Sequence, residues 1–134
     1  MAEVADENMN QLSRIGELLK KQGYDVEEPQ HGVMWVTIEY AYLISYSKDD
    51  TNFYQLMFPM GLEEKEKRGA EYLKAINTAN TRSKLAKAYM DKDDDLAIVV
   101  DVIASGPEEF VTNFARYVSA IQTLLDQFDA LVGG

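Results

Sequence analysis

The side chains best suited to metal or acid–base chemistry in this sequence are one histidine and several acidic runs. His31 is the only histidine, and the chain contains no cysteine. A protein metal site of the zinc type needs three or four converging ligands, and neither a second histidine nor a thiolate exists to share the ion. His31 precedes Gly32 at an expected turn. We therefore expect a structural or solvent-exposed histidine.

The run Asp91-Lys92-Asp93-Asp94-Asp95 places acids at the first, third and fifth positions of a calcium-loop motif. The rest of the motif is missing. Leu96 occupies the sixth position, where the sharp bend requires glycine, and Val102 occupies the twelfth, where a bidentate glutamate belongs. The run predicts a charged hairpin turn.

Three pairs of adjacent carboxylates are Glu27/Glu28, Glu63/Glu64 and Glu108/Glu109. Acid–base catalysis needs carboxyl groups that converge in a sheltered cleft, and neighbours in a loop or first helical turn do not indicate this. The sequence has no nucleophile elbow, phosphate-binding loop or dinucleotide fingerprint. We expect no catalytic residues, no metal and no cofactor, and hence no enzyme.

Two further features concern structure and binding. Asn77 and Asn80 stand where a helix meets a strand, and asparagine can adopt left-handed backbone and bond freed carbonyls, so we expect a structural corner there. The outer face of the last helix carries few long charged residues. It is either a mild solvent-facing surface or a partner-binding face. Its candidate partner-binding residues are Ala115, Ser119, Gln122 and Thr123.

Hydrophobic periodicity predicts the elements that position these residues. Helical spacing predicts helices over about 9–22, 62–80 and from Ser105 to about 132. Asn8 with Gln11, and Ser105 with Glu108, have capping-box spacing, and Pro107 suits a first turn. Strands are predicted by their β-branched and aromatic content. They span about 33–40, 41–47, 53–58, 83–90 and 96–103.

The resulting order is α-β-β-β-α-β-β-α, an α+β fold with an antiparallel sheet packed with helices. With 134 residues we expect a single domain over 1–134, with an ordered core of about 8–132. The N-terminus lacks a signal-peptide pattern, and the longest apolar run, Leu96 to Val100, is too short to cross a bilayer. We expect a cytoplasmic protein that does not span or bind a membrane.

The net charge is −10, from 23 acids and 13 bases. Nucleic-acid binding needs clustered Lys and Arg, and the densest basic stretch, residues 65–68, is neutralised by neighbouring glutamates. We therefore expect no nucleic-acid partner. Acids dominate from Asp91 onward, which serves either solubility or attraction of a basic client.

The chain resembles the YbjN-like domain family, described as bacterial sensory transduction regulators. That family is similar to the type III secretion chaperone fold. The resemblance covers residues 15–131. It rests on Ile15-Gly-Glu-Leu-Leu-Lys-Lys-Gln-Gly-Tyr, Ala75-Ile-Asn-Thr-Ala-Asn, Lys84-Leu-Ala-Lys-Ala-Tyr-Met-Asp, the acidic hairpin and the long last helix. It implies the same order of elements and a small acidic protein, often dimeric, that offers a surface to other proteins.

Together these observations predict a non-catalytic protein-binding module, chaperone-like or regulatory. Its partner would be a protein client or regulator, with a homodimer as one alternative. A second hypothesis is a small-ligand sensor domain with a pocket between sheet and helices. The aromatic residues named for that pocket, which could equally form ordinary core, are Trp35, Tyr42, Tyr54 and Phe58.

Overall fold

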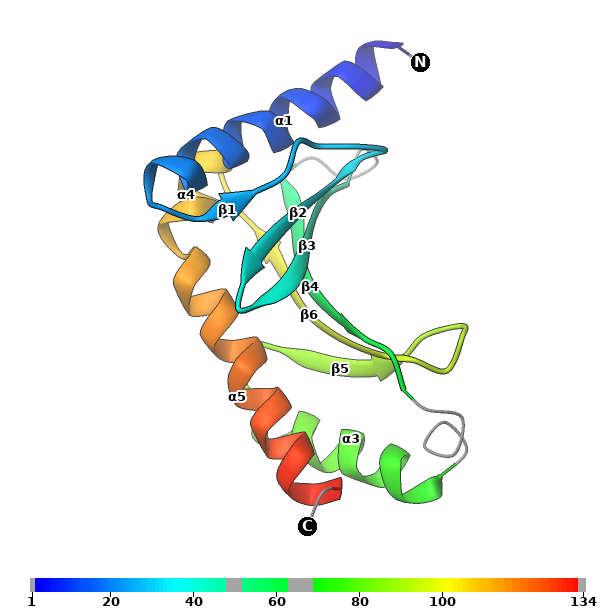
Figure 1. Cartoon of the computed structure of the whole chain (residues 1–134). Helices are drawn as coiled ribbons and strands as arrows, with labels where there is room; N and C mark the ends of the chain where they lie inside the picture. Colours follow the sequence, from blue (N-terminus) through cyan, green and yellow to red (C-terminus); the bar gives the residue numbers. More distant parts are fainter. Residues whose placement is uncertain (1, 48–51, 63–68, 133–134) are drawn as a thin grey trace. The chain divides into compact units, whose positions relative to one another are not determined.

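The computed structural model describes residues 2–47, 52–62 and 69–132, with residues 2–8 described by their backbone alone (Figure 1). The helices are α1 (Ala2–Lys21), α3 (Ala70–Arg82), α4 (Pro107–Thr112) and α5 (Phe114–Val132). The strands are β1 (Asp25–Val26), β2 (Val33–Ile38), β3 (Tyr40–Tyr46), β4 (Phe53–Met60), β5 (Lys87–Met90) and β6 (Leu96–Ile103).

The described strands form a six-stranded sheet in the order β1-β2-β3-β4-β6-β5. Strand β2 pairs antiparallel with β1 and with β3, and β5 pairs antiparallel with β6. The sheet and the helices that pack against it confirm the predicted α+β class and its order of elements. The break between the predicted strands 33–40 and 41–47, now β2 and β3, falls at Glu39. Its φ of 67° reverses the chain between the register partners Ile38 and Tyr40.

Contacts group the chain into two compact units. Unit 1 comprises Met1–Leu56 and Asp101–Ala115, and unit 2 comprises Met57–Val100 and Arg116–Gly134. The boundary falls inside β4, inside β6 and near the start of α5.

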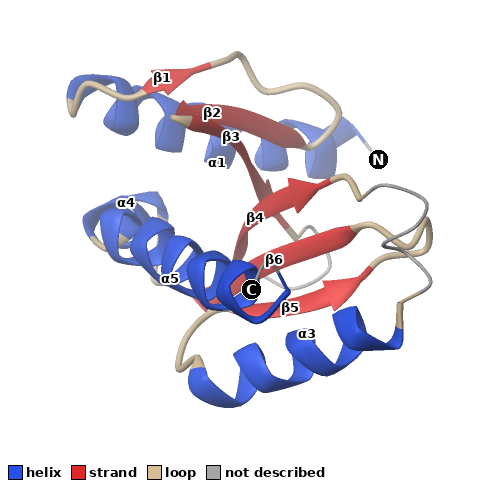
Figure 2. Ribbon diagram, turned by 60° about the horizontal axis from the view of Figure 1, so that its bottom comes forward, coloured by secondary structure: helices blue, strands red, loops and turns tan. Residues whose placement is uncertain are grey.

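In unit 1, α1 packs against β1, β2, β3 and α4 (Figure 2). Leu12, Ile15 and Leu19 follow helical spacing on α1 and are completely buried. The core contains a chain of aromatic rings: Tyr46–Tyr54, Tyr54–Phe110, Phe110–Phe114 and Tyr24–Phe114, with centroids 5.1, 5.2, 6.1 and 5.1 Å apart. Offset and edge contacts of this kind add to the hydrophobic stabilisation.

In unit 2, α3 packs along the edge strand β5, as Figure 2 also shows. Tyr72 of α3 contacts Phe128 of α5, with ring centroids 5.6 Å apart. Strand β6 is buried on both faces from Leu96 to Val100. Exposed and buried residues alternate only from Asp101 onward, where the strand enters unit 1.

The first helix begins earlier than predicted. Helix α1 starts at Ala2, so Asn8 lies inside it and the capping box predicted from Asn8 and Gln11 is wrong. The preceding residues contain two alanines and acids that suit a helix start, so the helix extends past the asparagine. Strand β1 was not predicted at all, because two residues carry no periodicity.

The other two helices also differ from the prediction. Leu62 precedes α3 as irregular backbone, and α3 begins after Gly69 and continues to Arg82; residues 63–68 of the predicted helix lie outside the described residues. The last helix is divided at Asn113, whose φ and ψ are −102° and 7°. The side chains of Thr112 and Asn113 bond the carbonyls of Glu108 and Glu109, and such bonds compete with helix continuation. No helix within 2–47, 52–62 and 69–132 is long and apolar enough to cross a membrane.

Candidate functional site

His31 is exposed and has a φ of 54°, immediately before Gly32 with a φ of 81°. The pair forms the turn that enters β2. Within the described ranges, no group of three or more His, Asp or Glu side chains could hold a metal ion. His31 is therefore a solvent-exposed residue of this turn.

The acidic run 91–95 forms the hairpin turn between β5 and β6. Asp91 uses Oδ1 to accept hydrogen bonds from the backbone N–H groups of Asp93 and Asp95, at 2.8 and 3.0 Å. Asp94 takes a φ of 60°. Asp95 accepts a hydrogen bond from the backbone N–H of Leu62 at 3.0 Å. Two of these carboxylates thus shape the turn and tie it to the chain after β4.

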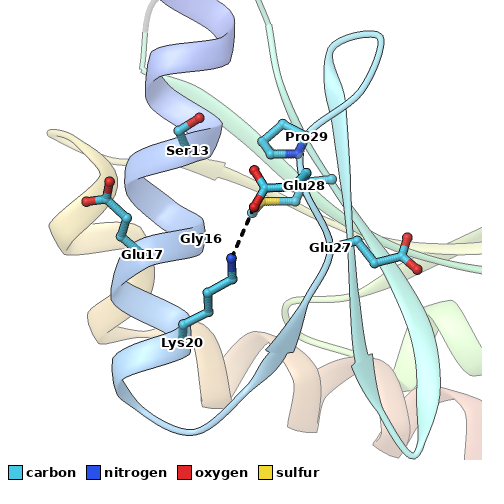
Figure 3. Close-up of a pocket in the computed structure, with 8 residues that line it drawn as sticks. Ser13, Gly16, Glu17, Lys20, Glu27, Glu28 and Pro29 are labelled. Atoms are coloured by element: carbon cyan, nitrogen blue, oxygen red, sulfur yellow. Dashed lines mark hydrogen bonds and ion pairs between the residues drawn. The ribbon is translucent and has the colours of Figure 1, made fainter.

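The described carboxylate pairs do not converge. Glu28 bonds the ammonium of Lys20 at 3.4 Å, while the exposed Glu27 points its carboxylate away from that pair (Figure 3). Glu63 and Glu64 lie outside the described residues. Figure 3 also shows a hollow, about 220 Å³ in volume, between α1 and the connection from β1 to β2. Its floor is tight, because a Cβ added at Gly16 would lie 3.1 Å from Sδ of Met34.

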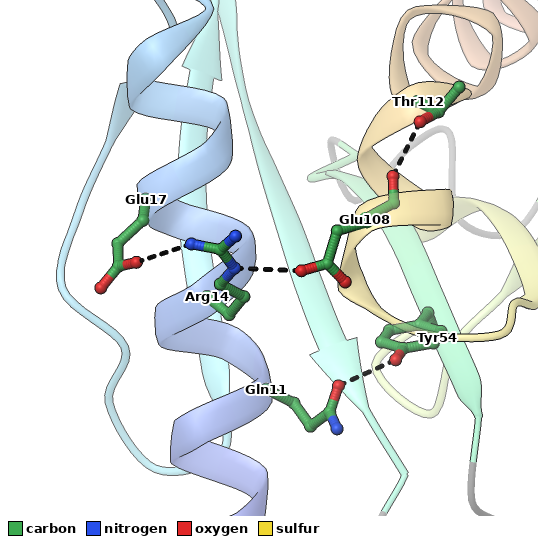
Figure 4. Close-up of polar contacts among 6 residues, drawn as sticks. All are labelled: Gln11, Arg14, Glu17, Tyr54, Glu108 and Thr112. Carbon is green, nitrogen blue, oxygen red and sulfur yellow. Dashed lines mark hydrogen bonds and ion pairs between the residues drawn. The ribbon is translucent and has the colours of Figure 1, made fainter.

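The other described pair, on α4, has two separate roles. Glu108 receives a hydrogen bond from the Arg14 guanidinium at 3.1 Å, and Arg14 also bonds Glu17 (Figure 4). The backbone N–H of Glu108 and then Arg14 hold the pKa of the Glu108 carboxyl below its ordinary value, and Arg14 has its pKa raised, chiefly by Glu108. Glu109 instead bonds the hydroxyl of Ser105 at 2.7 Å. These contacts fix α4 to α1 and shape the start of α4.

The capping partner of Ser105 is therefore Glu109, and the predicted pairing with Glu108 is wrong. Gly106 is the N-cap residue, which puts Pro107 at the start of the helix as predicted and places Glu109 three residues after the cap. The predicted capping box does not form, because Gly106, in extended backbone, takes the cap position and Glu109 bonds the preceding Ser105.

Beside the α1–α4 contacts, the hydroxyl of Tyr54 donates a hydrogen bond to Oε1 of Gln11 at 2.9 Å (Figure 4). Burial raises the pKa of Tyr54 to about 12, with smaller contributions from Tyr46 and Glu108. Tyr42 and Tyr54 are 1% and 0% exposed, and Phe58 is also buried. Three of the four aromatic residues named for a ligand pocket thus fill the core.

At the predicted corner, Asn80 forms two hydrogen bonds with one residue of β5. Its Nδ2 donates to the carbonyl of Ala88 at 3.0 Å, and its Oδ1 accepts from the N–H of Ala88 at 2.8 Å. Asn77 is exposed, and its side chain has no hydrogen bond within the described part of the chain. The structure therefore gives the two asparagines different roles.

The four candidate partner-binding residues lie along α5 but not all in one site. Ser119 and Thr123 are exposed and line a groove in unit 2. Gln122 is half-buried, and Ala115 is exposed in unit 1. The groove has a volume of about 310 Å³. Its lining consists of Arg82, Ser83, Lys84, Leu85, Arg116, Ser119, Ala120 and Thr123, and we call this set the α5 groove.

The basic residues of the α5 groove were missed by sequence reasoning. Arg116 follows a recognisable pattern, because positions 116, 119, 120 and 123 share one helix face. Arg82 and Lys84 come from the end of α3 and the segment before β5, and only the fold brings them to α5. The excess of acidic residues in the C-terminal part of the sequence therefore did not predict a local basic surface, because the fold brings its basic residues together.

A second surface in unit 1 is apolar and open to solvent. Met34 and Val36 of β2 are buried, whereas Trp35 between them is 37% exposed and stands opposite Leu43 of β3. On β6, Ile103 is 80% exposed. The bond from the Ala104 N–H to the Asn52 carbonyl puts Phe53 across from Ile103. We call Trp35, Leu43, Phe53 and Ile103 the open sheet face.

A polar bridge crosses the same face of the sheet. Nε2 of Gln55 donates to Oδ1 of Asp101 at 2.8 Å, joining β4 and β6. Leu43, Phe53 and Gln55 are each half-buried. The open sheet face is therefore a set of apolar side chains held on paired strands, with one hydrogen-bonded polar pair on the same face.

The described residues form an α+β fold that presents two candidate surfaces, the α5 groove and the open sheet face. A family model described as "Putative bacterial sensory transduction regulator" matches residues 11–133, and the chain therefore belongs to the YbjN family. This confirms the predicted membership of the YbjN family, while the likeness to the type III secretion chaperone fold stays a prediction.

A solved structure, described as "Crystal structure of YbjN, a putative transcription regulator from E. coli", is similar to the chain with a TM-score of 0.66. The match covers 86% of this chain and 89% of that one, at 14% sequence identity. At this identity the likeness establishes the fold. No curated protein matches the sequence significantly.

Proposed function

We propose that this chain is a non-catalytic protein-binding module with a regulatory or chaperone-like role. The family description as a regulator supports the regulatory part. The observation that carries the binding part is the open sheet face. The E. coli protein of the same fold is described as a transcription regulator, which agrees with a regulatory role but names no partner for this chain.

The open sheet face suits a protein partner because its apolar side chains are already fixed. Ile103 is 80% exposed, and an isoleucine side chain contributes roughly 1.5–3 kcal/mol when it passes from water into a fully buried site. Strand pairing holds Trp35 opposite Leu43, so little conformational entropy is lost when a partner covers them. Apolar groups on one face of the sheet, together with one hydrogen-bonded polar pair, have the composition of the core of a protein interface.

The absence of catalysis in the proposal is supported by the roles that the acidic side chains already have. The acidic residues considered for metal binding or catalysis have structural contacts instead. Asp91 shapes a turn, Glu109 bonds Ser105 at the start of α4, and Glu108 holds α4 to α1. Each of these carboxylates bonds its own local partner, whereas acid–base catalysis requires carboxyl groups that converge on one site.

The experiment compares two equally charged substitutions. Ile103→Lys introduces a charge into the open sheet face, and Leu73→Lys does the same at a side chain of α3 that is 59% exposed. Both variants and the unsubstituted chain are used for crosslinking capture in the native host, followed by quantitative mass spectrometry. We expect a partner that the unsubstituted chain and Leu73→Lys retain and that Ile103→Lys loses by at least tenfold.

Light scattering of the three proteins is measured in parallel, because a second copy of the chain is one partner that capture does not distinguish. Loss of a dimer with Ile103→Lys alone would identify the partner as the chain itself. Equal partner sets and equal masses for both variants would overturn the proposal. Circular dichroism controls for folding.

A further inference from the structure

The α5 groove concentrates positive charge in a protein of net charge −10. Arg82, Lys84 and Arg116 all line it. Within the described ranges, none of the three forms an ion pair, whereas Arg14 and Lys20 elsewhere do. Arginine and lysine that are left without carboxylates in an acidic protein create a local field opposite in sign to that of the whole molecule.

The end of helix α3 does not account for these cations. A helix C-terminus attracts positive charge, and Arg82 is in the last turn of α3. However, Lys87 already donates from Nζ to the carbonyls of Asn80 and Ser83, at 3.0 and 2.6 Å. The terminal carbonyls of α3 thus have a cation of their own, and Arg82 and Lys84 are left to face the groove.

The other wall of the α5 groove supplies hydroxyl groups and apolar surface. Ser119 and Thr123 lie one helical turn apart on α5, and Ser83 lies opposite. Leu85 is 39% exposed at the groove, and Ala120 leaves room beside it. Two guanidinium groups, an ammonium and the hydroxyls of Ser119 and Thr123 form a set that binds carboxylates by charge-assisted hydrogen bonds, while Leu85 offers an apolar contact. The Ser83 hydroxyl already donates to the carbonyl of Ala86 at 2.5 Å.

We propose that the α5 groove binds an acidic peptide segment of a partner protein, with carboxylates on Arg82, Lys84 and Arg116 and an apolar side chain against Leu85. A volume of about 310 Å³ is at the lower end of the roughly 300–1,000 Å³ of ligand pockets and suits a few side chains. Three cations are too few to hold nucleic acid against a net charge of −10. Recognition of acidic motifs by arginine clusters is an established mode of peptide binding.

This inference goes beyond the proposed function, because it concerns unit 2 and a partner of defined charge, whereas the proposed function depends on the open sheet face of unit 1. Either surface can fail its test while the other passes. The variants Ile103→Lys and Leu73→Lys leave the α5 groove unchanged.

The probe is a fluorescein-labelled twelve-residue peptide of alternating glutamate and leucine pairs, and the control peptide has glutamine in place of each glutamate. Fluorescence anisotropy is measured with the full chain. The groove variant combines Arg82→Gln, Lys84→Gln and Arg116→Gln. Its matched control combines Lys21→Gln, Lys74→Gln and Lys92→Gln, three exposed lysines outside the groove. Both lose three positive charges, so the net charge of each changes equally.

We expect saturable binding of the glutamate peptide and none of the glutamine peptide. The groove variant is expected to weaken binding at least tenfold, and the matched control less than twofold. Ser119→Trp fills the groove without changing charge and is expected to weaken binding similarly, which keeps the test valid if the triple groove variant fails to fold. Equal weakening by both triple variants would show that only the overall field acts, and would overturn the proposal.

Three other results would also overturn it: no saturable binding to the unsubstituted chain, unchanged binding by folded Ser119→Trp, or competition by single-stranded RNA as strong as by unlabelled glutamate peptide. The last result would mean that the groove binds anions without preference for a peptide.

Discussion

The side-chain amide of Asn80 makes the two backbone hydrogen bonds that a neighbouring strand would otherwise make with Ala88. Strand β5 is at the edge of the sheet, and the bond from the Asp91 N–H to the Asp95 carbonyl sets which residues of β5 point towards β6. By this alternation Ala88 points to the free edge, where its N–H and carbonyl would lack partners. The two bonds from Asn80 satisfy both groups and shield the edge from pairing with another chain.

Substitution of Asn80 is therefore expected to destabilise the fold. Asn80→Ala removes two hydrogen bonds and leaves the backbone of Ala88, a residue only 5% exposed, without partners. We expect a loss of about 1–3 kcal/mol in the free energy of unfolding, measured by urea denaturation. Asn77→Ala, in the same helix and exposed, is the control and should stay within about 0.5 kcal/mol. Equal losses for the two variants would contradict the role given to Asn80.

Tyr54 links stability to alkaline pH. Its pKa is raised from 10.0 to about 12 in the folded chain, chiefly by burial, because the fold favours the neutral phenol. The stabilisation is complete below pH 10 and is lost as the pH rises through 12. We expect the free energy of unfolding to fall more steeply between pH 10 and 12 for the unsubstituted chain than for Tyr54→Phe.

Urea denaturation at a series of pH values measures this difference, and absorbance titration at alkaline pH follows ionisation itself. The exposed Tyr40 and Tyr89 remain in both proteins, so their ionisation cancels in the comparison. Parallel pH profiles for the two proteins would show that Tyr54 ionises at its ordinary pKa.

Among the elements, helix α4 depends on how its first turn is satisfied. Glu109 reaches back to both the hydroxyl and the N–H of Ser105, at 2.7 and 3.3 Å, while Glu108 bonds Arg14 in full contact with solvent. The two bonds from Ser105 to Glu109 fix the residue before the N-cap, and a protein hydrogen bond contributes about 1 kcal/mol, whereas an exposed ion pair contributes little. Glu109→Ala should therefore lower the free energy of unfolding by about 1 kcal/mol, and Glu108→Ala by clearly less.

Thermal denaturation of the two variants gives the comparison, with Glu109→Gln as an intermediate that keeps a hydrogen-bond acceptor. A larger effect at Glu108 would support the pairing that the sequence spacing predicts. The distinction matters for sequence interpretation, because both glutamates stand close to the serine and only the position of the cap residue decides between them.

Elements with a long periodic pattern were predictable, and those decided by local competition were not. The stripe that continues from Phe110 to Phe128 predicts a helix correctly, but the same stripe hides the break at Asn113, where side chains take over backbone carbonyls. Strand β1 has two residues and exists because β2 offers it an edge. The corner at Asn80 was predictable from residue type, whereas its bond to Ala88 depends on where β5 begins.

The candidate surfaces show the same limit. Ser119 and Thr123 could be singled out because one helix carries both, at helical spacing. Arg82 and Lys84 reach the α5 groove from a segment more than thirty residues earlier, and no local pattern connects them with Arg116. The open sheet face was hidden for a related reason: Trp35 and Ile103 have the residue types of core, and only the structure shows that they are 37% and 80% exposed.

For the whole molecule, the prediction of a single domain implies that the chain unfolds cooperatively. Units 1 and 2 divide β4 between Leu56 and Met57, and β6 between Val100 and Asp101. Each strand is one continuous segment of backbone, and melting half of it would leave N–H and carbonyl groups at the break without partners. We therefore expect the two units to unfold in one transition.

The single tryptophan makes this testable, because Trp35 is in unit 1 and reports its unfolding by fluorescence, whereas far-ultraviolet circular dichroism reports both units. Asn80→Ala weakens unit 2, because Asn80 and its partner Ala88 both belong to that unit, whereas Trp35 belongs to unit 1. In one cooperative transition, this variant shifts the urea midpoint seen by fluorescence as far as the midpoint seen by circular dichroism. Tyr54→Phe, in unit 1, should shift both midpoints together as well. If Asn80→Ala moves only the circular dichroism transition, the units unfold separately, because destabilising one then leaves the strands of the other intact.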